Sequence, residues 1–285
     1  GIAPALERTH RPRRDRLRGC ASDSPAPPMP PGPIALRAES LHVTHGRVSA
    51  IAGVDLVLHA GEITALMGRN GSGKSSLLWA LQGSGPRSGG TVLLGDTDPA
   101  SLKPNDAIKR IVLVPHNPSD LLYLASVAAE CAEADLAAGA TPGTAEASLE
   151  QLWPGVPQSR HPRDLSEGQR LALALAIQLA GAPDVVLLDE PTRGLDYAAK
   201  RNLGALLREL AEGGTAVMLS SHDVEFIALT SHRVIVLADG EIIADADAPT
   251  ILSASPGGAP QVARILRPLR FLIVDAVREA LEASS

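Results

Sequence analysis

The stretch "ITALMGRNGSGKSSLLWALQG", residues 63–83, decides the fold of this 285-residue chain. It opens with a short apolar segment that suits a buried strand and closes with a segment typical of a helix. Between them, "GRNGSGKS" (68–75) matches the spacing G-x-x-x-x-G-K-[ST] in full. A glycine-rich loop between a strand and a helix is the context in which this spacing predicts a phosphate-binding loop.

The residue types in this loop follow from the chemistry of phosphate binding. Gly71 and Gly73 allow the backbone to curl, so that successive N–H groups point inward at phosphate oxygens. The start of the helix adds a partial positive charge. Lys74 supplies a point charge to the β- and γ-phosphates, and Ser75 offers a hydroxyl to Mg²⁺. The residues expected to bind the nucleotide here are Asn70, Gly71, Ser72, Gly73, Lys74, Ser75 and Ser76.

Two adjacent carboxylates end the apolar strand "VVLLDEP", residues 185–191. Because side chains alternate along a strand, Asp189 and Glu190 point in different directions and can take different tasks. We expect Asp189 to hold Mg²⁺ through its water shell, together with Ser75, and Glu190 to polarise the attacking water. Two acids after a strand are commonly an ordinary sheet end, so this assignment depends on the phosphate-binding loop.

Two shorter motifs accompany these. In "LSEGQR" (165–170), Ser166 is expected to be the N-cap of an apolar helix, and a small loop at a helix N-terminus is a ready site for a phosphate. In "SSHD" (220–223), His222 directly follows a strand end. A lone histidine is usually structural, but this one is expected at the edge of the sheet where ligands bind.

The order of segments predicts an α/β fold. Near-continuous apolar strands separated by helices indicate a mainly parallel central sheet, preceded by an antiparallel β layer and interrupted by an α-helical subdomain. The expected divisions are a disordered Arg/Pro-rich linker at residues 1–33, a nucleotide-binding domain at 34–250 with its helical subdomain at about 119–181, and a helical extension at 251–285.

Composition narrows the function further. A net charge of −6 counts against nucleic acid as a general partner. The arginine cluster at residues 8–18 leaves a second interpretation open, a basic arm that touches anionic lipid or nucleic acid. Cys20 and Cys131 suggest two reduced thiols rather than a disulfide framework or a zinc site. The chain has no run of about 18 apolar residues, so no membrane span is expected.

Taken in order, the motifs GRNGSGKS, LSEGQ, DVVLLDEP, GLD (194–196) and SSHD resemble the ATP-binding-cassette (ABC) ATPases over about residues 35–250. The resemblance implies a P-loop ATPase that uses ATP and Mg²⁺, with Glu190 as the catalytic glutamate and His222 as the histidine that contacts the γ-phosphate. His45, in "VTHG", lies where the family usually has an aromatic residue that stacks on adenine. Imidazole is a weaker stacking surface.

The resemblance also implies a head-to-tail dimer with a second ABC ATPase domain, identical or different. The signature residues Ser166, Glu167, Gly168 and Gln169 would then cap an ATP held on the partner's P-loop. Glu167 replaces the usual glycine, and a carboxylate near a γ-phosphate is repulsive. We therefore expect Glu167 to turn away, while Gly168 and the helix N-terminus keep the backbone contacts.

Three stretches, "HNPSDLLYLASVAAEC" (116–131), "EPTRGLDYAAK" (190–200) and "APQVARIL" (259–266), resemble the ATPases of energy-coupling-factor (ECF) transporters. The resemblance implies vitamin or transition-metal ion uptake with integral membrane subunits, at the cytoplasmic face of the cell membrane. The linker and the missing initiator methionine fit the second half of a fused double ATPase. The alternatives are a conventional importer or exporter, and a soluble ABC protein acting on ribosomes or DNA.

His116, after the strand "IVLV" (111–114), stands where the family has a glutamine whose oxygen reaches Mg²⁺. Because Mg²⁺ prefers oxygen ligands, we do not expect His116 to bind the metal directly. Three interpretations remain: His116 hydrogen-bonds the attacking or a Mg²⁺-bound water, it is a neutral spacer, or it marks a slow site. We predict that His116→Gln preserves or raises ATP turnover.

Overall fold

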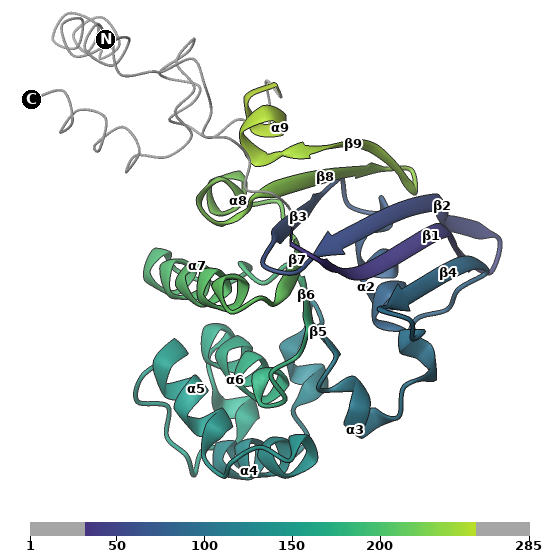
Figure 1. Ribbon diagram of the computed structural model, residues 1–285. Helices are drawn as coiled ribbons and strands as arrows, with labels where there is room; N and C mark the ends of the chain where they lie inside the picture. Colours follow the sequence, from purple (N-terminus) through teal and green to yellow (C-terminus); the bar gives the residue numbers. More distant parts are fainter. Residues whose placement is uncertain (1–31, 255–285) are drawn as a thin grey trace, which may run out of the picture.

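The computed structural model describes residues 32–254 and builds them around two sheets (Figure 1). One sheet has six strands in the order β5-β6-β7-β3-β8-β9, and the other has three in the order β2-β1-β4. The strands are β1 (Ile34–His45), β2 (Val48–His59), β3 (Ile63–Met67), β4 (Gly89–Leu94), β5 (Ile111–Val114), β6 (Val185–Asp189), β7 (Ala216–Ser220), β8 (Arg233–Ala238) and β9 (Glu241–Asp247).

Helices cover the strands and fill the connections between them. The helices are α2 (Lys74–Gln82), α3 (Pro104–Ala107), α4 (Val127–Ala138), α5 (Thr144–Leu152), α6 (Glu167–Leu179), α7 (Tyr197–Glu212), α8 (Val224–Thr230) and α9 (Ala248–Ala254). Short 3₁₀ turns lie at η1 (Pro99–Ser101), η2 (Pro118–Leu121) and η3 (Pro162–Asp164). Among the described residues, no helix combines the length and the apolar character needed to cross a bilayer.

The central sheet separates two parts of the core. In β6, Val186 and Leu188 pack with the helices α4 to α7, whereas Val185 and Leu187 pack with α2 and the three-stranded sheet. This alternation follows from the period of two along a strand. All five residues of β6 are buried, as expected for a parallel strand that is covered on both faces.

The helices α4, α5 and α6 pack against one another between β5 and β6 in the chain, below the strands in Figure 1. A buried carboxylate joins the first two: Asp135 of α4 accepts hydrogen bonds from the backbone N–H groups of Gly143 (2.7 Å) and Ala145 (2.9 Å) at the start of α5. Cys131 is buried beside it as a free thiol, and burial first, then nearby carboxylates, raises its pKa to about 11.

The predicted architecture is confirmed: a mainly parallel central sheet, an antiparallel layer formed by β1 and β2, and a helical insertion. Two strands add to this architecture. β4 extends the antiparallel layer by pairing with β1. The sequence did not predict β9, which closes the sheet by pairing antiparallel to β8. The expected N-terminal linker and C-terminal extension lie outside the described residues, apart from residues 32–33 and 251–254.

Candidate active site

The predicted phosphate-binding loop connects β3 to α2, and Lys74 closes it. The ammonium group of Lys74 donates hydrogen bonds to the carbonyl oxygens of Gly68 (2.8 Å) and Arg69 (3.2 Å). Gly73 is the N-cap of α2, and no side chain caps this helix start. The Ser72 hydroxyl is buried without a hydrogen-bond partner in the described part of the chain. The loop therefore has polar groups to offer to an anion, as a nucleotide phosphate requires.

Lys74 is a buried charge, only 7% exposed. Burial lowers its pKa from the ordinary value, while the nearby Glu190 and Asp189 act in the opposite direction. Burying an ammonium group is costly unless opposite charges compensate it. The two carboxylates at the end of β6 and the lysine of the loop therefore form one electrostatic unit.

Ser220, at the end of β7, arranges those two carboxylates. It lies opposite Asp189 in the parallel pairing of β6 with β7. Its hydroxyl donates to Asp189 Oδ1 at 2.6 Å and accepts the backbone N–H of Glu190 at 2.9 Å. Ser220 is fully buried, so water does not compete for these bonds. The backbone of Glu190 has φ +53°, a left-handed conformation that is uncommon for a glutamate and is held here by the bonds to Ser220.

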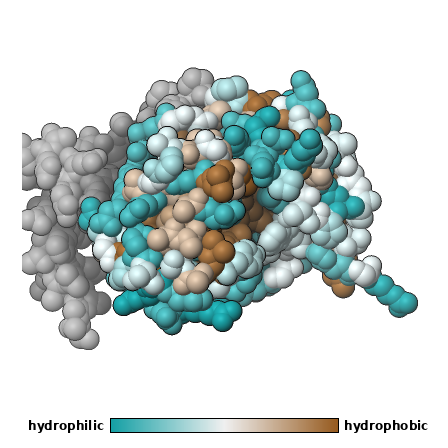
Figure 2. Space-filling model, turned by 90° about the horizontal axis from the view of Figure 1, so that it is seen from below, coloured by the Kyte–Doolittle hydropathy of each residue, from teal (hydrophilic) through white to brown (hydrophobic). Residues whose placement is uncertain are grey.

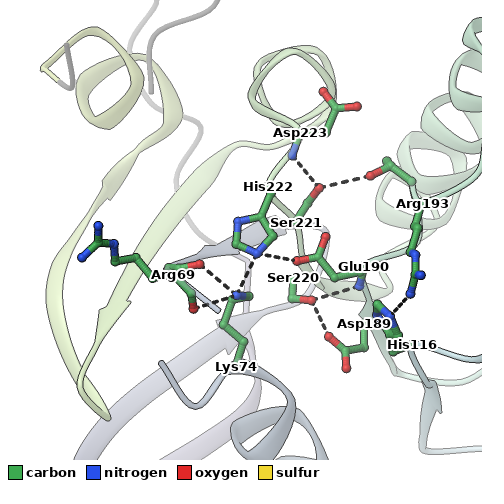
Figure 3. A network of polar contacts seen from close by, with 12 residues as sticks. Arg69, Lys74, His116, Asp189, Glu190, Arg193, Ser220, Ser221, His222 and Asp223 are labelled. Atoms are coloured by element: carbon green, nitrogen blue, oxygen red, sulfur yellow. Dashed lines mark hydrogen bonds and ion pairs between the residues drawn. The ribbon is translucent and has the colours of Figure 1, made fainter. Parts of the chain in front are cut away.

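His222 lies between Lys74 and Glu190 (Figure 3). Its Nε2 atom is 3.1 Å from Lys74 Nζ and 3.1 Å from Glu190 Oε1. Apart from this contact with His222, Glu190 Oε1 is buried without a hydrogen-bond partner among the described residues. That oxygen is thus available to accept a proton from a water.

Two side chains of the loop that carries His222, Ser221 and Asp223, tie it to its surroundings. Ser221 Oγ lies 3.2 Å from Thr192 Oγ1 and accepts the backbone N–H of Asp223 at 3.0 Å. Asp223 also forms an ion pair with Lys200 of α7 at 2.6 Å. These bonds link the turn after β6 to the turn after β7, so His222 and Glu190 are held by connected segments.

His45 lies at the end of β1, where its Nε2 is 3.0 Å from the hydroxyl of Ser76 in the first turn of α2. The imidazole is exposed and adjoins the phosphate-binding helix. This position is compatible with the expected contact to adenine.

The hydroxyl of Ser75 and the carboxylate of Asp189 are oxygen donors, the type that Mg²⁺ prefers. Within residues 32–254, no group of three or more His, Cys, Asp and Glu side chains could hold a metal ion.

The signature residues stand at the start of α6. Ser166 Oγ accepts the backbone N–H of Gln169 at 3.2 Å, and Gln169 Oε1 accepts that of Ser166 at 3.0 Å, so the expected N-cap is confirmed as a full capping box. Ser166 and Glu167 are exposed. The carboxylate of Glu167 lies against Gly194 of the same chain. Its orientation toward a partner's nucleotide stays a prediction.

Gly168 is buried against the indole ring of Trp153. A methyl group at residue 168 would lie 2.6 Å from Trp153 Cζ3 and 3.1 Å from Leu195 Cδ2, which is too close for a carbon contact. The need for glycine here thus arises at least in part from packing within the chain.

His116 receives a hydrogen bond from the Nη1 group of Arg193 (Figure 3). Both side chains line a small pocket together with Glu167, Asp189 and Glu190. Sequence reasoning did not select Arg193, although the stretch "EPTRGLD" that contains it was among the motifs. It also passed over Ser220 and Trp153. Of these, only Ser220 had a signal, a serine at a strand end directly before "SHD".

Comparison with known proteins agrees with this site. A profile of the family described as "ABC transporter" matches residues 51–193. A protein of Streptomyces avermitilis, whose name places it among ABC transporter ATP-binding proteins, is 53% identical over 271 residues, covering 95% of this chain and 48% of the relative. The chain spans about half the length of this protein and of a relative from Streptomyces coelicolor.

Two relatives are matched over more of their own length. The cobalt import ATP-binding protein CbiO of Rhodobacter capsulatus is 35% identical, with 76% of this chain and 80% of that protein covered. The energy-coupling factor transporter ATP-binding protein EcfA of Methanothermobacter thermautotrophicus is 34% identical, with 78% and 75% covered.

Solved structures show the same fold. The cbiO1 protein of Clostridium perfringens, part of the ABC transporter complex cbiONQ, aligns with a TM-score of 0.65 at 25% identity, covering 76% of this chain and 90% of that one. A dimeric ATP-binding cassette in a post-hydrolysis state bound to ADP and Pi has the same TM-score and identity, covering 75% and 98%. On the family profile and these relatives, the chain belongs to the ATP-binding proteins of ABC transporters.

Proposed function

We propose that this chain hydrolyses ATP and powers an importer of the energy-coupling-factor type. The observation that supports hydrolysis most directly is that Lys74, His222 and Glu190 converge. His222 Nε2 lies 3.1 Å from Lys74 Nζ and 3.1 Å from Glu190 Oε1. These residues come from three separate segments that meet at the same edge of the central sheet (Figure 3). Ligands of open α/β sheets bind at this edge.

In the proposed reaction, the phosphates of ATP lie against the loop 68–73 and the first turn of α2. Lys74 contacts the β- and γ-phosphates, and His45 lies beside the base. Ser75 and Asp189 would hold Mg²⁺, and the ion would supply positive charge to offset charge that develops on the phosphate oxygens. His222, whose Nε2 adjoins Lys74, contacts the γ-phosphate.

Glu190 is the proposed general base. Its Oε1 accepts one proton from the attacking water, the water oxygen bonds to the γ-phosphorus, and the bond from that phosphorus to the β–γ bridging oxygen breaks. The products are ADP and inorganic phosphate. Among the described residues, Oε1 has no hydrogen-bond partner and only the imidazole of His222 beside it, which supports this assignment because the atom can accept a water proton.

The partner that completes the site is proposed to be a second ATPase domain, identical or different. Ser166 and Glu167 are exposed at the start of α6, where another chain or domain can reach them. The dimeric solved relative supports this arrangement. Each Streptomyces relative is about twice the length matched, which leaves room for a second domain within one polypeptide.

The membrane subunits are proposed to dock on the helical face. Figure 2 shows apolar, brown and tan, surface gathered on the face seen from below, the side on which α4 and α5 lie in Figure 1. Leu136 of α4 is 75% exposed and Tyr123, just before α4, is 79% exposed. Exposed apolar patches of this kind commonly mark protein contacts. Such docking would place the chain at the cytoplasmic face of the membrane. The names of the relatives, a cobalt import protein and an energy-coupling factor transporter protein, support an importer of this type for a vitamin or a transition-metal ion.

The decisive experiment measures phosphate release by the full-length protein and by Glu190→Gln. We expect the variant to lose about 100-fold or more of the turnover, because general-base catalysis contributes on this order. It should also retain ATP and accumulate as a dimer in size-exclusion chromatography. Hydrolysis at the wild-type rate in Glu190→Gln would refute the assignment of the base. Detergent pull-down of a multi-pass membrane protein tests the importer, and co-sedimentation with ribosomes or DNA instead would refute it.

A further inference from the structure

The pairing of β5 with β6 brings His116 and Glu190 to the same end of the sheet. The two strands are parallel, and Val114, the last residue of β5, lies opposite Leu188. His116 follows β5 by two residues and Glu190 follows β6 by one, so both lie just beyond the carboxyl ends of neighbouring strands. The residue that follows the end of β5 and the proposed catalytic base therefore share one edge of the sheet.

The chain then reverses immediately after Glu190. The backbone N–H of Arg193 donates to the carbonyl oxygen of Glu190 at 3.2 Å, and Pro191 occupies the second position of this turn, which proline favours. The turn directs Arg193 back toward β5, where its guanidinium reaches His116 (Figure 3). The segment around Glu190 is thus linked to β5 twice, before Glu190 by the pairing of β6 with β5 and after it by the hydrogen bond from Arg193 to His116.

The chemistry of this bond sets its direction. A guanidinium carries only donors, so His116 Nε2 is the acceptor in it.

The charge at Arg193 suits its surroundings. The pocket that it lines with His116 also contains the carboxyl-bearing residues Glu167, Asp189 and Glu190. A guanidinium at this place offsets their negative charge and donates to His116 at the same time. A neutral side chain of similar length supplies neither effect.

We propose that Arg193 is a positioning residue for ATP turnover: through its hydrogen bond to His116, it holds the turn that carries Glu190 against the end of β5. This inference rests on the proposed function, because it concerns the same reaction. It gives His116 a task that requires a hydrogen-bond acceptor and no metal. Glutamine also has an acceptor oxygen, so a glutamine at residue 116 is expected to receive the same bond.

The test compares Arg193→Met with wild type in steady-state ATPase assays on the full-length protein. Methionine keeps a long side chain and removes the donor. We expect kcat to fall about tenfold while KM for ATP and the melting temperature stay close to wild type, because the variant disturbs the catalytic turn and not the phosphate-binding loop. Arg193→Lys, which keeps a charge and a donor, should recover part of the rate. Arg201→Met, an exposed arginine on α7, is the matched control and should leave kcat unchanged.

Double variants identify His116 as the residue through which Arg193 acts. In the His116→Ala background, Arg193→Met should lower kcat no further, since the acceptor is already gone. In the His116→Gln background, Arg193→Met should again lower kcat about tenfold, since the amide oxygen replaces the acceptor.

Independent, multiplying effects of His116→Ala and Arg193→Met would overturn the inference. So would wild-type kcat in Arg193→Met, or a fall in melting temperature that accounts for the lost rate. In each of these cases, hydrolysis by the wild-type protein leaves the proposed function standing. A wild-type protein that neither binds nor hydrolyses ATP would refute the proposed function, and the inference with it.

Discussion

Two helices of this protein begin at phosphate-binding motifs, and they begin in opposite ways. The helix α2 starts after Gly73 without any side-chain cap. The helix α6 starts at Ser166 with a complete capping box, in which Ser166 and Gln169 satisfy each other's backbone N–H groups. An uncapped helix start leaves amide donors for a ligand, whereas a capped one is stable by itself. The start of α2 therefore has free amide donors for an anion, whereas the start of α6 is satisfied within the chain and leaves Ser166 and Glu167 exposed.

The burial of polar groups shows the same contrast. Near α2, Lys74 is 7% exposed, Asp189 5% and Ser220 0%. At α6, Ser166 and Glu167 are exposed. Lys74, Asp189 and Ser220 are buried and interact with other polar groups, so replacing any of the three leaves a buried partner unsatisfied. At α6 an exposed residue can change with little cost to the fold, which is why a glutamate can occupy a position that usually holds glycine.

The largest effect is expected from Lys74→Ala, which removes the only lysine of the phosphate-binding loop. ATP binding should weaken about ten- to hundredfold, because charge-assisted hydrogen bonds are lost and the carboxylates of Asp189 and Glu190 lose their counter-charge. Equilibrium titration with a fluorescent ATP analogue measures the change. Lys103→Ala, at an exposed lysine, is the control. Unchanged binding by Lys74→Ala would show that the uncapped start of α2 does not receive the phosphates.

An intermediate effect, on stability, is expected from Gly168→Ala, which changes only the start of α6. The added methyl group meets Trp153 at 2.6 Å, and overpacking of this kind costs about 1–3 kcal/mol of unfolding free energy. Urea unfolding measures the loss, while ATP affinity should remain at the wild-type value. In the Trp153→Leu background the same substitution should cost less, because the ring that it strikes is gone. An equal cost in both backgrounds would show that Trp153 does not set the need for glycine.

Much of this fold could be predicted because its signals are local. The loop 68–75 has a fixed spacing between a strand and a helix, and apolar runs mark β5, β6, β7 and β8. The strand β9 was missed because its pattern, with several acidic residues, depends on pairing with β8 rather than on its own composition. The pairing of β4 with β1 was missed for the same reason, because the sequence of one strand does not show which distant strand it pairs with.

The candidate site was predictable where one residue type carries the chemistry. Lys74, Asp189, Glu190 and His222 meet as their motifs suggest. Ser220 and Arg193 could not be selected in this way, because their importance arises from what they contact. Ser220 matters through the register of β7 with β6, and Arg193 through a turn that returns the chain toward β5. Both are tertiary relations between segments far apart in sequence.

The smallest effect on the isolated chain is expected from Ser166→Ala, and it separates the two helix starts most directly. Loss of the N-cap should lower the unfolding free energy by about 1 kcal/mol. ATP affinity of a single chain should not change, because the loop before α2 is untouched. In combination with Glu190→Gln, however, the ATP-dependent dimer should weaken, since Ser166 loses the hydroxyl proposed to contact the partner's nucleotide.

Ser166→Asn distinguishes the two roles of this serine. Asparagine is as good an N-cap as serine, so the unfolding free energy should return toward the wild-type value. The hydroxyl is still missing and the side chain is larger, so the ATP-dependent dimer should remain weak in size-exclusion chromatography with ATP. If Ser166→Asn restored the dimer along with the stability, the helix cap alone would explain the role of Ser166 in the dimer, and a hydroxyl contact to the partner's nucleotide would be refuted.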